Sequence, residues 1–245
     1  MKFQTVKVIS NKEIAKGIYD MVLEGAFSGA PGQFYMLRAW EEEPVLSRPI
    51  SIEDVDSKSI TFLYQTVGKG TKIMAKLKAG DEIKIQGPLG NTFPVEEVKG
   101  KKVGIITGGI GIAPMKLLVK NLEADTVEIH CGFRNESYLV DSLKPYVNNI
   151  YISTESGNEG HKGYVTDEFD ASIYDVVLCC GPEIMMNKVI KICKDKNVPV
   201  YVSMEKHMAC GVGACLVCTC KTKDGNKRTC KDGPVFLGSD VILDA

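Results

Sequence analysis

The sequence predicts three parts in order: an antiparallel six-stranded β barrel, a five-stranded parallel α/β domain with helices on both faces, and a small cysteine-rich C-terminal module. Up to about residue 95, short segments of alternating polar and apolar residues are separated by turn residues. Beyond residue 102, apolar strands alternate with helical stretches, and from Ser203 onward the chain is rich in Cys, Gly and Lys. We place the three parts at residues 1–97, 98–202 and 203–245.

The barrel is predicted from six segments of period-two alternation within the first 100 residues, which is typical of a small antiparallel barrel. Turn sequences such as Ala79-Gly80-Asp81 separate them. One helix is expected between the last two strands, over Thr71 to Leu77, where apolar residues recur at helical spacing. The predicted strands are Phe3 to Ile9, Ile18 to Leu23, Gln33 to Arg38, Pro49 to Glu53, Ser59 to Val67 and Glu82 to Gln86.

A charged passage over residues 96–102 marks the change to alternating strands and helices, the pattern of a parallel sheet covered on both faces. The predicted strands are Val103 to Thr107, Val127 to Cys131, Ile150 to Ser153, Val176 to Cys180 and Val200 to Val202. The predicted helices are Pro114 to Leu122, Ser137 to Lys144 and Glu183 to Lys194. In the tail, Asp224-Gly225-Asn226 predicts a hairpin turn.

Composition excludes several classes of protein. The chain has 245 residues, 44% hydrophobic and 25% charged, so it can bury a core without disulfides. Thirty basic against thirty-one acidic residues give a net charge of −1, which provides no overall field for nucleic acid or an anionic membrane. The N-terminal residues lack the apolar core of a secretory signal, and no apolar run reaches the roughly 18 residues of a membrane span. We therefore expect a cytoplasmic protein.

Five of the nine cysteines lie within a single 21-residue stretch. Cys210, Cys215 and Cys218 form a Cys-x4-Cys-x2-Cys motif, and Cys230 follows at a distance, which is the spacing of plant-type [2Fe-2S] clusters. Four thiolates must converge on two irons, so three come from one tightly wrapped loop. Glycines within the motif let the backbone approach the inorganic sulfides. These four cysteines are the predicted metal ligands.

The cysteines of the tail also permit other interpretations. A structural zinc site usually has two Cys-x2-Cys pairs or Cys with His, and only one such pair occurs here. Cys215 to Cys218 alone could be a thioredoxin-like redox motif, although it lacks the expected βαβ setting. We interpret Cys220 as a non-ligand, because in an extended segment it would project away from a ligand at Cys218.

A glycine loop follows the first strand of the predicted parallel sheet. It runs from Gly108 through Gly109 and Gly111 to Pro114, and an amphipathic helix follows it. Such a turn brings backbone amides and the positive end of a helix dipole against a pyrophosphate. The loop departs from the Rossmann fingerprint, because Pro114 stands where the third Gly or Ala belongs, and a tight strand-to-helix turn is the alternative.

Two barrel motifs fit a flavin nucleotide. Arg48-Pro49-Ile50-Ser51 opens a strand with an Arg that can pair with a diphosphate and a hydroxyl that can hydrogen-bond a flavin ring edge. Gly70-Thr71, at the start of the predicted helix, can offer amide donors to phosphate. Each alone could equally be a surface arginine or an ordinary helix cap, so their order ahead of a nucleotide domain is what makes them informative.

These motifs, with Cys180-Gly181-Pro182, resemble the ferredoxin reductase-like family, in which an FAD-binding barrel precedes a nicotinamide-nucleotide domain. The tail is more specific. Met208 to Cys218, together with Cys230 to Phe236, resembles the electron-transfer subunits of the NAD-linked bacterial dihydroorotate dehydrogenases. The resemblance covers essentially the whole chain.

The resemblance implies an oxidoreductase subunit that acts in an electron relay. Electrons from the FMN of a dihydroorotate-oxidising partner subunit would pass singly through the [2Fe-2S] cluster to FAD and leave as a hydride to NAD+, in de novo pyrimidine (UMP) biosynthesis. The expected assembly is a heterotetramer with two copies of each subunit. No catalytic side chain is required for the hydride step, so His130, His161 and His207 are not catalytic candidates.

The resemblance also assigns cofactor residues. For FAD they are Arg48, Pro49, Ile50, Ser51, Leu63, Tyr64, Gln65, Gly70 and Thr71. For NAD they are Gly108, Gly109, Gly111, Pro114, Cys180, Gly181 and Pro182.

Two other functions also fit this sequence. The chain could instead be a related flavin and iron-sulfur NAD(P)H oxidoreductase subunit that serves a ferredoxin or sulfur-reducing partner, or a structural zinc module in a partner-binding protein. Arg134 follows the second parallel strand, where a cation can pair with a 2′-phosphate, so NAD and NADP both stay possible.

An electron path needs the cluster loop near the partner subunit. We therefore expect Val212, Ala214 and Leu216 to contribute to the surface that binds the partner.

Overall fold

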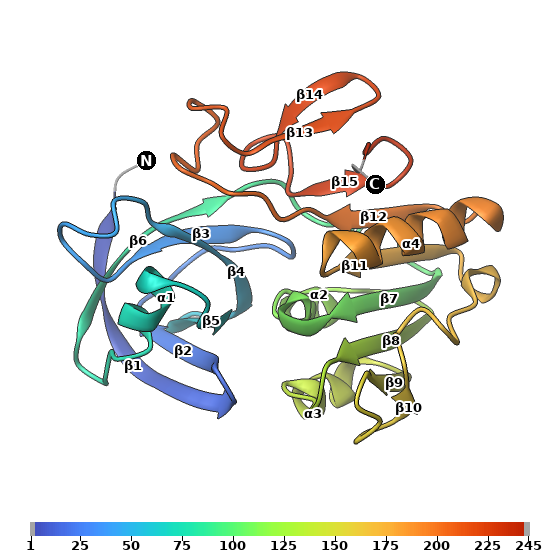
Figure 1. Ribbon diagram of the computed structural model, residues 1–245, viewed down its shortest axis with the longest axis horizontal. Helices are drawn as coiled ribbons and strands as arrows, with labels where there is room; N and C mark the ends of the chain where they lie inside the picture. Colours follow the sequence, from blue (N-terminus) through green and yellow to red (C-terminus); the bar gives the residue numbers. More distant parts are fainter. Residues whose placement is uncertain (1–2, 243–245) are drawn as a thin grey trace.

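The computed structural model describes residues 3–242. The outermost ends of the first and third predicted parts, residues 1–2 and 243–245, lie outside the described residues. Figure 1 shows the barrel (blue to teal) beside the α/β part (green to orange), with the tail (red) across the top of both in this view. Within residues 3–242, no helix is long and apolar enough to cross a membrane.

Six antiparallel strands close into a barrel, as predicted, and neighbour one another in the order β1-β2-β5-β4-β3-β6. Period-two alternation turns one face of each strand inward: Met21 and Phe62 lie opposite each other on β2 and β5, and both are fully buried. The first strand is longer than predicted, because Ser10 to Ala15 also pair with β2. The elements are β1 (Gln4–Ala15), β2 (Ile18–Glu24), β3 (Phe34–Arg38), β4 (Arg48–Val55), β5 (Ser59–Gln65), α1 (Lys69–Met74) and β6 (Glu82–Leu89).

The five predicted parallel strands are all present and neighbour one another in the order β9-β8-β7-β11-β12. Two short edge strands extend this sheet to seven: β10 pairs parallel with β9, and β15 pairs antiparallel with β12. The elements are β7 (Lys102–Gly108), β8 (Thr126–Phe133), β9 (Asn149–Thr154), β10 (His161–Lys162), β11 (Val176–Cys180), β12 (Val200–Ser203) and β15 (Val235–Leu237).

Helices cover both faces of this sheet, as the alternating pattern predicted. The helices α2 (Met115–Lys120) and α3 (Val140–Leu143) share one buried cluster with strands β7, β8 and β11, and α4 (Glu183–Asp195) packs in a second cluster on the opposite side chains of β11 and β12. The helix predicted over Ser137 to Lys144 is shorter than expected. Leu139 has a left-handed φ of 66°, and Pro145 follows at the other end in a short 3-10 turn (Lys144–Tyr146), so both ends of the helix are fixed by backbone conformation.

The barrel and the α/β part share buried apolar residues. Ile18 and Leu63 of the barrel belong to the same cluster as Val103 and Ile105 of β7, and Leu117 of α2 belongs to the barrel's own core. Because the two parts are joined by packed side chains, the space between them has a defined shape.

The tail is attached to both parts. Its hairpin, β13 (Thr219–Thr222) and β14 (Gly225–Arg228), turns at Lys223-Asp224, one residue earlier than predicted. Its last strand, β15, completes the edge of the parallel sheet. The segment carrying the cysteines packs on the barrel, where Cys218 and Cys230 share a buried cluster with Phe34, Met36 and Leu89.

Candidate functional site

A cavity of about 620 Å³ opens between the barrel, the turn after β7 and the segment that follows β12. Eight of the nine residues predicted to bind FAD line it, and Gly70 is the exception. Cys180, predicted for the nicotinamide nucleotide, lines the same cavity. The eight residues are Arg48, Pro49, Ile50, Ser51, Leu63, Tyr64, Gln65 and Thr71.

Arg48 is held against an aromatic ring at this cavity. Its guanidinium carbon lies 5.4 Å from the centre of the Trp40 ring, and Nη1 donates a hydrogen bond to the Leu46 carbonyl at 2.5 Å. Gly70 lies beneath this pair, since a Cβ there would stand 2.7 Å from Trp40 and 2.9 Å from Arg48. Gly70 therefore makes room for the arginine instead of lining the cavity itself.

Two other residues predicted to bind FAD use their hydroxyl groups in hydrogen bonds to other protein groups. The Thr71 oxygen accepts hydrogen bonds from the backbone amides of Val67 and Gly68 and so closes the turn before α1. The Tyr64 hydroxyl donates to Asn11 at 3.0 Å, and burial raises the pKa of this phenol. Tyr64 thus lines the cavity wall, while its hydroxyl group is already hydrogen-bonded to Asn11.

The segment from Ser203 to Met208 forms a wall of the cavity that sequence reasoning missed. Lys206 in this segment pairs with Glu183 of α4 at 3.1 Å, and His207 also lines the cavity. No local sequence motif predicts this role. The segment reaches the cavity only because the chain runs back toward the barrel after β12.

A second cavity of about 470 Å³ lies at the carboxyl ends of β7 and β8. Of the residues predicted for the nicotinamide nucleotide, Gly108, Gly109 and Pro182 line it. Arg134 lies in the same cavity, as do Glu155 and Lys188, which sequence reasoning missed.

The loops after β7 and β11 contribute residues to both cavities, at the place where the strand order reverses. β7 has β8 on one side and β11 on the other, so the loops after β7 and β11 diverge at a topological switch point, where open α/β sheets bind their ligands. Gly111 allows these loops to touch, because a Cβ there would lie only 2.4 Å from the Cys180 carbonyl oxygen. Gly111 and Gly181 thus allow the two loops to lie in contact. Neither of them lines either cavity, and the same holds for Pro114, which precedes α2.

The four predicted cluster cysteines lie close together in the tail. Within residues 3–242, no three His, Cys, Asp or Glu side chains are already gathered in metal-coordinating geometry. The thiols instead approach in two pairs, Cys210 with Cys215 and Cys218 with Cys230. Two pairs of thiols are the donor set that two irons of a [2Fe-2S] cluster need.

Backbone amides point at the sulfurs. Gly213 N donates to Cys230 Sγ at 3.1 Å, and Gly213 has a φ of +82°, a conformation that favours glycine. Although burial opposes ionisation, amide donors lower the pKa of Cys210 to about 6. Burial and the Cys218 sulfur raise the pKa of Cys230 to about 12, so iron binding there must displace a proton. The loop fits an iron-sulfur cluster both in its donors and in its amide cradle.

Comparison with known proteins agrees with this geometry. Residues 205–242 match the family model described as the iron-sulfur cluster binding domain of dihydroorotate dehydrogenase B. The whole chain is 60% identical over 242 residues to the dihydroorotate dehydrogenase B (NAD(+)) electron transfer subunit of Clostridium acetobutylicum, covering 99% of this chain and 98% of that one. It is 51% identical over 245 residues to the subunit of the same name from Clostridium perfringens, with 98% of each covered.

The chain belongs to the electron-transfer subunits of dihydroorotate dehydrogenase B.

Solved structures place this electron-transfer subunit in the ferredoxin reductase-like fold. A chain of the NADH-dependent reduced ferredoxin-NADP oxidoreductase, described for flavin-based electron bifurcation, superposes with a TM-score of 0.88 at 28% identity and covers 98% of this chain and 90% of its own. The ferredoxin reductase of carbazole 1,9a-dioxygenase matches at a TM-score of 0.68 and 17% identity, over 82% of this chain and 68% of its own, and shows the fold alone.

The family and fold confirm three sequence predictions for this electron-transfer subunit: the resemblance itself, an oxidoreductase subunit, and the cofactor set of FAD, a [2Fe-2S] cluster and NAD. The assignment of individual side chains to each cofactor stays a prediction. The two cavities and the two thiol pairs are the places where these cofactors would bind. Cys220 is buried in β13, and burial raises the pKa of its thiol. Its assignment as a non-ligand also stays a prediction.

Proposed function

We propose that this subunit receives electrons from the FMN of a dihydroorotate-oxidising partner and passes them through its [2Fe-2S] cluster and FAD to NAD+, in the cytoplasmic synthesis of pyrimidines (UMP). The proposed assembly has two copies of each subunit. When bound, FAD accepts electrons one at a time and releases two as a hydride, so no side chain need serve as acid or base in that step.

The order of the sites along the molecule carries the proposal. Phe34 and Met208 line the first cavity and also pack in the buried cluster that contains Cys218 and Cys230. On the other side, Cys180 lines the first cavity and Pro182 lines the second. The flavin cavity therefore lies between the cysteine loop and the nucleotide cavity, which is the order that the relay requires.

The chain's own residues would bind and orient the two nucleotides. Arg48, with its guanidinium held on Trp40, is placed to pair with a diphosphate at the mouth of the first cavity. Gly109 leaves the backbone open at the second cavity: nothing lies within 4 Å of where a Gly109 Cβ would stand, so a pyrophosphate can approach the amides. Gly108 instead packs against Met185 and Pro182, since a Cβ there would stand 2.7 Å from the Met185 sulfur. Cys210, Cys215, Cys218 and Cys230 would hold the cluster.

Glu155 favours NAD over NADP in this proposal. The loops after β8 and β9 run together, since Glu155 N donates to the Phe133 carbonyl at 3.1 Å and Ser156 N donates to the Arg134 carbonyl at 3.0 Å. A carboxylate and a guanidinium therefore share the cavity end where an adenosine ribose lies in this type of fold. The carboxylate can accept the ribose hydroxyls and repels a 2′-phosphate.

The cysteine loop presents an apolar surface for the partner subunit. Val212 is 42% exposed and Leu216 is 62% exposed, and Ala214 between them is exposed as well. Val217, at 54%, adds to the three residues predicted from the sequence. Apolar side chains beside the ligand cysteines are expected where two redox centres must come within electron-transfer distance across an interface.

A second candidate function follows from the solved ferredoxin-NADP oxidoreductase chain, which matches over almost the whole length. A subunit of this fold could exchange electrons with a ferredoxin. The 60% identity to a dihydroorotate dehydrogenase subunit favours the first candidate.

The deciding experiment uses the purified full chain. Its absorption spectrum should show flavin bands and a broad iron-sulfur feature, and iron and FAD should be countable at two and one per chain. NAD+ reduction should require both dihydroorotate and an FMN-containing dihydroorotate-oxidising subunit. Reduction of NAD(P)+ by reduced ferredoxin, with no response to that partner, would instead support the second candidate, and a colourless zinc protein would overturn both.

A further inference from the structure

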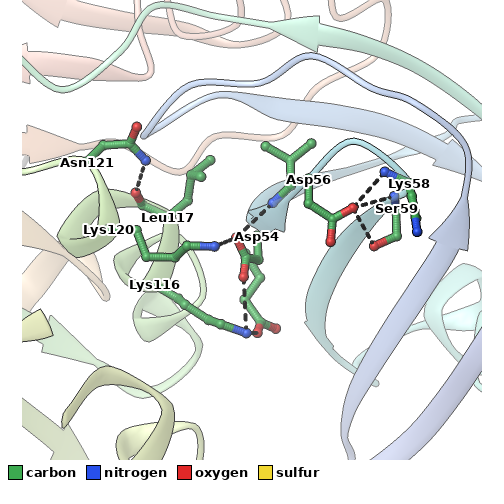
Figure 2. A network of polar contacts seen from close by, with 10 residues as sticks. Asp54, Asp56, Lys58, Ser59, Lys116, Leu117, Lys120 and Asn121 are labelled. Carbon is green, nitrogen blue, oxygen red and sulfur yellow. Dashed lines mark hydrogen bonds and ion pairs between the residues drawn. The ribbon is translucent and has the colours of Figure 1, made fainter. Parts of the chain in front are cut away.

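An ion cluster around the buried Glu53 joins the barrel to the nucleotide part, among residues that line neither cavity. Lys116 Nζ of α2 lies 3.2 Å from Glu53 Oε1 and 3.4 Å from Asp54 Oδ2, both on β4. Lys120, one turn along α2, lies 2.6 Å from the other Asp54 oxygen. Figure 2 shows the two lysines reaching from α2 toward Asp54.

The Glu53 carboxyl is costly to bury, and it is incompletely paired. The Glu53 side chain is 0% exposed and Lys116 is 23% exposed. Among the described residues, Glu53 Oε2 and Asp20 Oδ1 are buried oxygens without a hydrogen-bond partner. Replacing buried ion pairs of this kind by apolar residues is often neutral or stabilising. Stability alone therefore accounts poorly for the cluster, and its location suggests another role.

The cluster connects the two binding elements at short range along the chain. Glu53 follows Ser51, which lines the flavin cavity, by two residues on the same strand. Lys116 follows Pro114, which ends the glycine loop of the nucleotide cavity, by two residues. Leu117 of the same helix packs in the barrel core, so α2 contacts the barrel through both apolar and charged side chains. A displacement between β4 and α2 therefore changes the distance between the two cavities.

We infer that Glu53 and Lys116 form a latch that sets the position of the nucleotide-binding loop relative to the flavin-binding strand, and so act as positioning residues for hydride transfer. This inference rests on the proposed function. Two reacting groups must approach to about 3 to 3.5 Å, and a misplacement of about 1 Å can cost about 100-fold in rate. A directional charge pair at the joint restricts such sliding more tightly than apolar contacts do.

The test compares the full chain with the double variant Glu53→Gln/Lys116→Met, which removes both charges at nearly constant volume. Lys99→Met is the matched control, since it breaks an exposed pair with Glu123 within the nucleotide part. We expect backbone amides of β4 and α2 to exchange hydrogen for deuterium at least fivefold faster in the double variant. We also expect flavin reduction by NADH to slow at least tenfold, with FAD content and NADH affinity within twofold of wild type. The control should match wild type in every measurement.

Unchanged exchange and flavin reduction within twofold of wild type would overturn the latch. If the double variant fails to fold, Glu53→Gln alone and Lys116→Arg give the answer: the first should slow flavin reduction and the second, which keeps the charge, should restore most of the wild-type rate. Wild-type protein that binds FAD but is not reduced by NADH would count against the proposed function, whereas the exchange measurement would still decide whether the latch exists.

Discussion

The side chain of Asn91 pairs with the backbone of Val235 in both directions: its Nδ2 donates to the Val235 carbonyl at 2.7 Å, and its Oδ1 accepts from the Val235 amide at 2.9 Å. Nδ2 also donates to the Asp232 carbonyl at 3.2 Å. These bonds join the segment after β6 to the tail just beyond Cys230. Asn91, 144 positions before Val235 in the chain, therefore ties the segment just beyond the last predicted cluster ligand to the barrel.

Asn91→Ala should loosen the tail. Three hydrogen bonds of about 1 kcal/mol each are lost, so the free energy of unfolding should fall by about 2 to 3 kcal/mol. Chemical denaturation measures the loss of stability, and the rate of iron release to a chelator should rise in parallel. Asn226→Ala, at an exposed position of the tail hairpin, should change neither quantity. Equal iron release in the two variants would contradict the role of the three Asn91 hydrogen bonds, the Asn91 clamp, in holding the tail.

The cysteines should separate into ligands and non-ligands. Serine at Cys210, Cys215, Cys218 or Cys230 should lower the iron content and the visible absorption, because each removes one thiolate of the donor set. Cys220→Ser should keep both near wild type. Iron counting and absorption spectra check this prediction, and loss of iron from Cys220→Ser with retention in Cys218→Ser would reverse the assignment.

Cofactor preference should depend on Glu155. Glu155→Gln should raise the efficiency with NADP about tenfold relative to NAD, since removal of one like charge near a 2′-phosphate is worth about 1 to 2 kcal/mol near a protein surface. Adding Arg134→Ala should cancel most of this gain, because the cation that would pair with the phosphate is then absent. The ratio of kcat/KM for the two nucleotides is the readout, and an unchanged ratio in Glu155→Gln would place the ribose elsewhere.

The Glu53 carboxyl should make stability depend on pH. Burial, together with the charge of Asp20, raises the pKa of Glu53 to about 7, against the opposing charge of Lys116. A carboxyl whose pKa is raised on folding contributes stability below its unfolded pKa of 4.5 and loses that contribution as the pH rises through about 7. Relative to Glu53→Gln, wild type should therefore lose up to about 3 kcal/mol between pH 4.5 and 7.5.

Denaturation curves of the two proteins at several pH values measure this difference. Asp20 and Asp54 face the same site with Lys116 and Lys120, and all four are the same in both proteins, so the comparison isolates the change at residue 53. A stability difference that stays flat across this range would show that Glu53 keeps an ordinary pKa.

Leu216→Asp should weaken binding of the partner subunit at least tenfold. Leu216 is 62% exposed and has a φ of +61°, a conformation that Asp adopts more readily than Leu, so the substitution should not harm the fold. Ile173→Asp, at another exposed apolar residue, is the control. Binding measurements with the FMN-containing subunit decide the matter, and equal affinities for both variants would exclude the cysteine loop from the interface.

The fold class and the cofactor set could be predicted from the amino-acid sequence alone. Alternation of period two predicted the barrel, alternating apolar strands and helices predicted the parallel sheet, and the cysteine spacing predicted an iron-sulfur loop, because each of these patterns is local in the chain. The predictions were wrong where backbone conformation or long-range strand pairing sets the extent of an element. The helix α3 is shortened by Leu139 and Pro145 at its two ends. The strand β15 of the tail joins the parallel sheet, which the sequence did not indicate.

The order of the sites and the contacts that join them follow from the packing of the three parts and could not be predicted from the sequence. The wall from Ser203 to Met208, the Asn91 clamp and the pair of Glu53 with Lys116 all bring together residues that are far apart in sequence. Lys, Glu and Asn are common on protein surfaces, so their identity carries no signal of such contacts. Their roles follow from burial and distance, which arise only when the barrel, the parallel sheet and the tail pack against one another.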